Sequence, residues 1–116
     1  MKKTLLIASV LAASFAYTPA LHAEENLSLR ICEYVSANDK KRLRSFLKKS
    51  KLKIRSVFDK IQCNGQNLLE FAASSEGLDV GEMIIGKLPV KTVAENIDLI
   101  TKHSAHLAVV AKKRIN

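Results

Sequence analysis

The chain has 116 residues, which is enough for one small domain and too few for two domains of ordinary size. Its 19 Lys and Arg residues outnumber its 11 Asp and Glu residues, so the formal net charge at pH 7 is +8. The sequence contains neither a glycine-rich phosphate loop nor a Gly-x-Ser-x-Gly nucleophile motif, which argues against P-loop nucleotide-binding proteins and serine hydrolases.

The first 23 residues are typical of a bacterial secretory signal peptide. Met1-Lys2-Lys3 is a short positive region, and Leu5 to Ala16 is an almost unbroken apolar run. That run is shorter than the ~20 residues that span a bilayer, and no later stretch is as apolar. We therefore expect export to the periplasm, no transmembrane segment, and cleavage after Ala23, with Ala20 as the alternative site.

Two cysteines follow the expected cleavage site, within a single small helical domain of residues 24–116. A domain of that size has a marginal core, and the expected compartment is oxidising. We therefore predict a disulfide between Cys32 and Cys63. The alternatives are two free thiols or a pair of metal ligands. A metal site is disfavoured because no histidine or second cysteine pair lies nearby in the sequence.

Gly and Pro are scarce, and apolar residues recur at spacings of three and four, as in Ile31, Tyr34 and Val35. This pattern predicts helices joined by short turns. Residues 51–61 fit both a strand and a helix, and we favour an extended segment followed by a short helical turn. The fold class is all-α, with about six short helices in stacked hairpins, over residues 28–37, 40–49, 68–75, 80–88, 90–103 and 105–114.

Helix starts are marked by residues whose side chains can cap them. Asp39 and Ser104 precede two of the predicted helices. Asn67 with Glu70, and Asp79 with Glu82, have the spacing of a capping box. The turn signals are Asn38-Asp39, Cys63-Asn64-Gly65 and Glu76-Gly77, and Pro89 limits the helix before it.

Two segments share one plan: 34–47 and 72–85 each contain a helix end, a polar turn and a second helix with apolar residues at matching offsets. The second segment, with Asn64-Gly65 before it, resembles the ankyrin repeat. Asn67, Leu68 and Glu70 stand where that family has Thr, Pro and His, and the turns at Asn38 and Glu76 are 38 residues apart. The ankyrin-like positions are Leu69, Ala72, Ala73, Asp79 and Val80.

The resemblance implies a stack of helical hairpins. One repeat cannot bury its own apolar face, so the two C-terminal helices would close the stack, and the disulfide would tie the first helix to the turn before the third. The whole chain also resembles a family of small exported bacterial proteins of unknown function, on the stretches 31–35, 38–40 and 63–65. That resemblance implies the export and the disulfide, and no activity.

The positive charge is concentrated in one stretch. Residues 40–60 contain ten Lys and Arg residues and one acidic residue, Asp59. The stretch is open to three interpretations: a solvated face, a site for membrane or lipopolysaccharide phosphate, or a site for an acidic protein. Nucleic acid is disfavoured because few aromatic residues are available for base stacking. The anion-binding candidates are Lys40, Lys41, Arg44, Lys48, Lys49 and Lys51.

Catalytic chemistry has little support in this sequence. His103 and His106 could contribute two metal ligands, but no third ligand is evident, and a solvated turn is the favoured interpretation. We expect no enzyme activity, no metal and no cofactor. The leading expectation is a non-catalytic binding module of the envelope that recognises a protein partner through an ankyrin-like stack. The alternative is a binder of anionic envelope surfaces through residues 40–55.

Overall fold

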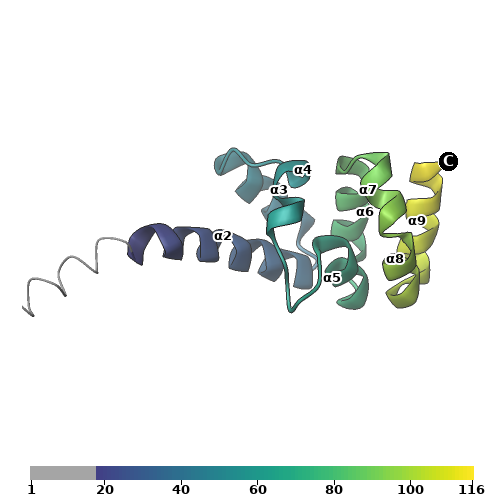
Figure 1. The fold of residues 1–116 in the computed structure, drawn as a ribbon, viewed down its shortest axis with the longest axis horizontal. Coiled ribbons are helices and arrows are strands. Elements are labelled where there is room, and N and C mark those ends of the chain that lie inside the picture. Colours follow the sequence, from purple (N-terminus) through teal and green to yellow (C-terminus); the bar gives the residue numbers. More distant parts are fainter. Residues whose placement is uncertain (1–17) are drawn as a thin grey trace, which may run out of the picture.

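Short helices follow one another through the part of the chain that the computed structural model describes, residues 18–116 (Figure 1). The all-α prediction is confirmed. The remaining residues of the predicted signal peptide, 1–17, lie outside the described range. The elements are α2 (Thr18–Ser36), α3 (Lys40–Lys49), α4 (Ile54–Val57), the 3₁₀ helix η1 (Phe58–Lys60), α5 (Leu68–Ser74), α6 (Leu78–Lys87), α7 (Val90–Glu95), α8 (Ile97–His103) and α9 (Ala105–Ile115).

The longer helices form three hairpins that stack in sequence order. Helix α2 pairs with α3, α5 with α6, and α8 with α9. Across the hairpins, α2 contacts α5 and α5 contacts α8, while α3 contacts α6 and α6 contacts α9. The hairpins therefore form two rows of three helices, and α7 packs against the last hairpin. In Figure 1, α2 extends away from the other helices at one end, and α8 and α9 lie at the opposite end.

One apolar core runs through the stack, because each helix turns an apolar face toward its neighbours. Both rows contribute: Leu68 and Leu69 lie in α5, and Ile84 and Ile85 lie in α6, with almost no exposed surface. Leu43 and Leu47 are the buried face of α3, as their spacing predicts. No helix among residues 18–116 is both long enough and apolar enough to cross a bilayer.

The predicted disulfide is present between Cys32 and Cys63, whose Cα atoms lie 5.7 Å apart. Cys32 lies in α2, and Cys63 begins the turn that leads to α5. The bridge therefore links the first hairpin to the second. Within the turn, Asn64 and Gly65 both have positive φ angles, 54° and 78°, and Cys63 and Gln66 pair across it.

Two hairpin turns have the same geometry at the spacing of the predicted repeat. Asn38 and Glu76 have φ angles of 54° and 59°. In the first turn the Asp39 N–H donates to the Tyr34 carbonyl, and in the second the Gly77 N–H donates to the Ala72 carbonyl, each at 2.9 Å. These bonds satisfy carbonyls that the helix ends would leave free.

Three helix boundaries differ from the sequence prediction. Helix α2 begins at Thr18 rather than at residue 28, because the residues after Pro19 include good helix formers and no further helix breaker. The helix predicted over 90–103 divides at Asn96, which is buried. Its side-chain amide donates to the Thr92 carbonyl at 2.8 Å, and such a bond competes with the helical ladder.

The third difference concerns the start of α6. Asp79 is not the cap predicted for this helix, because the helix begins at Leu78 with Gly77 in the cap position. By contrast, Asp39, Asn67 and Ser104 cap α3, α5 and α9 as predicted, each accepting a hydrogen bond from a backbone N–H of the first turn.

Candidate functional site

The basic stretch folds into α3, the loop after it, and α4 with η1. All six predicted anion-binding residues are exposed to solvent: Lys40, Lys41, Arg44, Lys48, Lys49 and Lys51. Helix α3 holds the first five of them, because Leu43 and Leu47 anchor its opposite face in the core, while Phe46 packs against Tyr34 with ring centroids 5.7 Å apart. The charges therefore lie on a fixed helix face.

A tight turn reverses the chain after α3. Lys51 has a φ angle of 56°, and the Leu52 N–H donates to the Leu47 carbonyl at 2.8 Å. This is a common C-terminal cap of an α-helix. A residue in the left-handed conformation follows the helix, and a carbonyl of the last turn accepts a hydrogen bond from an N–H beyond it. As a result, Lys53 and Arg55 return to the same groove as Arg44.

A groove of about 410 Å³ lies between this reversed segment and α6. Arg44, Lys48, Lys53, Arg55 and Lys87 supply its positive charges. Its apolar lining combines the buried Leu47 and Ile54 with the half-buried Leu52 and Met83. We call this site the α3–α6 groove.

A second recess of about 360 Å³ continues the α3–α6 groove toward the start of α6. It shares Arg44, Met83 and Lys87 with the groove, and adds Lys40 together with two carboxylates, Asp79 and Glu82. The positive charge is therefore less concentrated at this end. Of the cations in the groove, Lys48, Lys53 and Arg55 do not line this recess.

The structure divides the predicted candidates into two groups. Arg44 and Lys48 line the α3–α6 groove and Lys40 lines the adjoining recess, whereas Lys41, Lys49 and Lys51 line neither. Sequence reasoning missed Lys87 and Met83, because they lie in α6 and reach the site only through the packing of α3 on α6. The one sequence signal for that packing was the plan that residues 34–47 and 72–85 share, in which α3 and α6 hold equivalent positions.

Most Lys and Arg side chains of residues 40–60 remain available to bind an external anion, because few of them form ion pairs with the side chains that the structure describes. Among residues 26–116, whose side chains the structure describes, the only ion pair formed by a cation of residues 40–60 joins Arg42 Nε to Asp39 Oδ2 at 3.4 Å. Both residues lie at the start of α3, away from the α3–α6 groove lining. Apart from this pair, and outside the recess that Asp79 and Glu82 line, the positive face is thus not neutralised by acidic side chains of residues 26–116.

His103 and His106 do not converge on one site. His103 Nε2 lies 3.2 Å from Glu70 Oε2, and His106 Nε2 lies 2.7 Å from Glu82 Oε2, so each histidine contacts a different helix. Among the described residues, no group of three or more His, Cys, Asp or Glu side chains is placed to hold a metal ion. The two pairs join α8 to α5 and α9 to α6.

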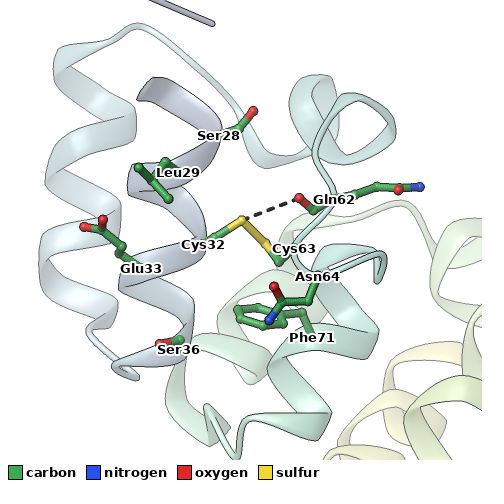
Figure 2. A pocket seen from close by; sticks show the side chains of 9 residues that line it. All are labelled: Ser28, Leu29, Cys32, Glu33, Ser36, Gln62, Cys63, Asn64 and Phe71. Atoms are coloured by element: carbon green, nitrogen blue, oxygen red, sulfur yellow. Dashed lines mark hydrogen bonds between the residues drawn. A yellow bond between two sulfur atoms is a disulfide. The ribbon is translucent and has the colours of Figure 1, made fainter. Parts of the chain in front are cut away.

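A third pocket, of about 420 Å³, lies beside the disulfide (Figure 2). Leu29 and Glu33 of α2 line one side, and Asn64 and Phe71 line the other. The dashed line in Figure 2 joins Cys32 Sγ to the Gln62 carbonyl oxygen at 3.8 Å. Because a disulfide sulfur carries no proton, this approach is a van der Waals contact. The pocket has one charged side chain and no convergent set of donors.

Comparison with known proteins places the chain in a family. No curated protein and no solved structure matches it. A family model does match, over residues 31–95, a range that begins in α2 and ends with α7 and therefore includes Cys32, Cys63 and the whole basic stretch. Since this match spans more than half of the sequence, the chain belongs to the family described as "Protein of unknown function (DUF3718)".

Proposed function

We propose that the chain is an exported, non-catalytic binding module that attaches to anionic surfaces of the bacterial envelope. The observation that carries the proposal is the exposed positive face of α3 and α4, in which, among the side chains described for residues 26–116, ion pairing involves only Arg42. Clustered cations attract anionic lipid or lipopolysaccharide phosphate, and each Lys or Arg near an anionic surface contributes about 1 kcal/mol. The same field would speed the encounter with the surface.

Export is supported by the signal-peptide pattern of residues 1–23 and by the disulfide, which is typical of an oxidising compartment. Cleavage after Ala23 would divide α2. Ile31 and Val35 of α2, which are buried in the core, follow that site and would be kept. Amino-terminal sequencing of the periplasmic protein is expected to begin at Glu24. A protein that stays in the cytoplasm with Met1 intact would contradict export.

Anionic-surface binding is tested with vesicles that contain an anionic phospholipid and with neutral vesicles as the reference. We expect binding to the anionic vesicles alone, with an affinity that falls as salt is added. The triple variant Lys40→Glu, Arg44→Glu and Lys48→Glu is expected to lower the affinity by at least a factor on the order of a hundred.

The control for that variant carries the same change in net charge on a different part of the surface. Lys91→Glu, Lys112→Glu and Lys113→Glu reverse three exposed charges in α7 and α9. If both triple variants lose binding equally, net charge alone explains attachment and the proposed surface is wrong. Binding to neutral vesicles that is unaffected by salt would also contradict it.

A second candidate function, recognition of a protein partner through an ankyrin-like stack, is favoured by the order of the helical hairpins. The two equivalent turns at Asn38 and Glu76 and the two rows of stacked helices are compatible with such a repeat. A pull-down from periplasm that recovers one protein at high salt, and that the α3 charge reversals leave unchanged, would support this candidate over the first.

A further inference from the structure

The α3–α6 groove combines two chemical properties that a purely electrostatic surface does not need. Its walls are cationic, and its lining between them is apolar. We infer that this groove binds a single-chain anionic amphiphile, with the head group on the cations and the alkyl chain along the apolar lining. The inference rests on the proposed function, because it assigns anion binding to one defined site and names the ligand.

The apolar part of the groove gives an alkyl chain a surface to cover. Leu47 and Ile54 are buried at its base, whereas Leu52 and Met83 remain partly open to solvent. Covering them with a methylene chain removes apolar surface from water, which favours binding. Free phosphate would gain nothing from these side chains. The volume of about 410 Å³ lies within the ~300–1,000 Å³ of small-molecule sites.

The charged part of the groove determines which end of the ligand lies where. Arg44 and Lys48 are four residues apart and therefore lie one above the other on α3. Arg55 faces the same groove, and an arginine fork can hold a phosphate or carboxylate through two hydrogen bonds. Asp79 and Glu82 line the adjoining recess and repel an anion there. The head group is therefore expected near α4.

The first experiment asks which part of the ligand is recognised. The disulfide-bonded protein is titrated by calorimetry with dodecyl phosphate, below its micelle concentration, and separately with inorganic phosphate and with dodecyl maltoside. Dodecyl phosphate is expected to bind at least on the order of a hundredfold more tightly than inorganic phosphate, because each covered methylene strengthens binding severalfold. It should also bind more tightly than dodecyl maltoside, because only the charged head group gains charge-assisted hydrogen bonds from the groove's cations. Equal affinity for inorganic phosphate, or for the neutral maltoside, would overturn the inference.

The second experiment uses two variants of identical charge on one helix. Arg44→Gln with Lys48→Gln changes the groove wall, whereas Lys41→Gln with Lys49→Gln changes exposed residues of α3 outside the groove. The first pair is expected to weaken dodecyl phosphate binding about tenfold or more, and the second pair to weaken it less than about threefold. Equal losses would place the ligand outside the groove and overturn the inference.

A third variant separates this inference from the proposed function. Met83→Gln makes the lining polar without changing the charge, at a half-buried position that tolerates a side chain of similar shape. We expect weaker dodecyl phosphate binding and unchanged attachment to anionic vesicles. Unchanged binding of both would reject the groove and retain the surface proposal, whereas absence of vesicle attachment in the wild-type protein would reject the proposed function itself.

Discussion

The side chain of Asn38, in the turn of the first hairpin, caps helix α6 of the second. Asn38 Oδ1 accepts a hydrogen bond from the Val80 N–H at 3.0 Å, and its Nδ2 donates to Asp79 Oδ2 at 3.3 Å. The residue in the cap position of α6 is Gly77, which has no side chain to offer. Asn38 thus performs the capping role from the neighbouring hairpin and couples the two hairpins.

Removing the side chain of Asn38 should therefore cost about 1 kcal/mol, the usual contribution of a helix cap, relative to a glycine substitution at the same φ angle that removes no cap. Asn38→Gly is the appropriate change, because the φ angle of 54° would strain alanine and add a backbone effect to the loss of the cap. The free energy of unfolding, from denaturant titration followed by circular dichroism, measures the effect.

Asn64→Gly is the matched control. Asn64 has the same φ angle of 54°, is exposed, and forms no side-chain hydrogen bond with the described residues. Glycine should be neutral or slightly stabilising there. If the two variants unfold at the same denaturant concentration, the Asn38 side chain does not couple the hairpins.

Gly77 is required in this arrangement because the second hairpin approaches the backbone of the first. A Cβ atom at Gly77 would lie 2.7 Å from the Val35 carbonyl oxygen, and a backbone atom cannot move aside easily. Gly77→Ala should cost about 1–3 kcal/mol of unfolding free energy, the usual range for overpacking.

The comparison for Gly77→Ala is Gly86→Ala. Gly86 lies in α6, is exposed, and has no neighbour within 4 Å of an added Cβ. Alanine there should stabilise the protein by up to about 1 kcal/mol through helix propensity. The two alanine substitutions therefore have opposite expected signs, and a shared sign would refute the close approach at Gly77.

These contacts explain which parts of the fold the sequence predicts and which it does not. Asp39, Asn67 and Ser104 were identified as caps because each bonds to an N–H three residues later, so the signal is local. The sequence assigns the cap of α6 to Asp79, because the side chain that accepts from the Val80 N–H belongs to Asn38, 42 residues earlier. No local pattern encodes such a distant pair.

The same distinction applies to the end of the long predicted helix and to the candidate site. Asn96 interrupts that helix while Asn67 Nδ2 donates to its Oδ1 at 2.6 Å, a contact between residues 29 positions apart. Four of the five cations of the α3–α6 groove were evident from composition, because they belong to the basic stretch of residues 40–60, whereas Lys87 was not. The apolar lining of the groove was not evident either, because Met83 joins Leu52 only through tertiary packing.

Packing between α6 and α9 predicts a non-additive pair of substitutions. A Cβ atom at Gly81 would lie 2.6 Å from Leu107 Cδ1 and 2.9 Å from Cδ2, and Leu107 is buried. Gly81→Ala should therefore cost about 1–3 kcal/mol, and Leu107→Ala about 2–5 kcal/mol. The double variant should cost less than the sum, because each change relieves the other. Additive effects on the unfolding free energy would mean that the two residues are not in contact.

The disulfide should supply a large share of the stability, because it links α2 to the turn before α5 across a separation of 31 residues. Closing a loop of that length contributes roughly 3.5–4 kcal/mol in the chain-entropy treatment. Replacing both cysteines, Cys32→Ala with Cys63→Ala, should lower the unfolding free energy by that amount. Ile31 and Val35 still pack in the core, so helical circular dichroism should persist at low temperature.

A reductant provides the internal control for this prediction. Dithiothreitol should lower the stability of the wild-type protein to that of the double alanine variant and leave the variant unchanged, because only the wild type has a bond to reduce. A thiol titration of the denatured, unreduced wild-type protein should find no free sulfhydryl. Two titratable thiols per molecule in protein purified from the periplasm would show that Cys32 and Cys63 are not bridged there, and the link between the first two hairpins would then depend on Asn38 and the apolar core alone.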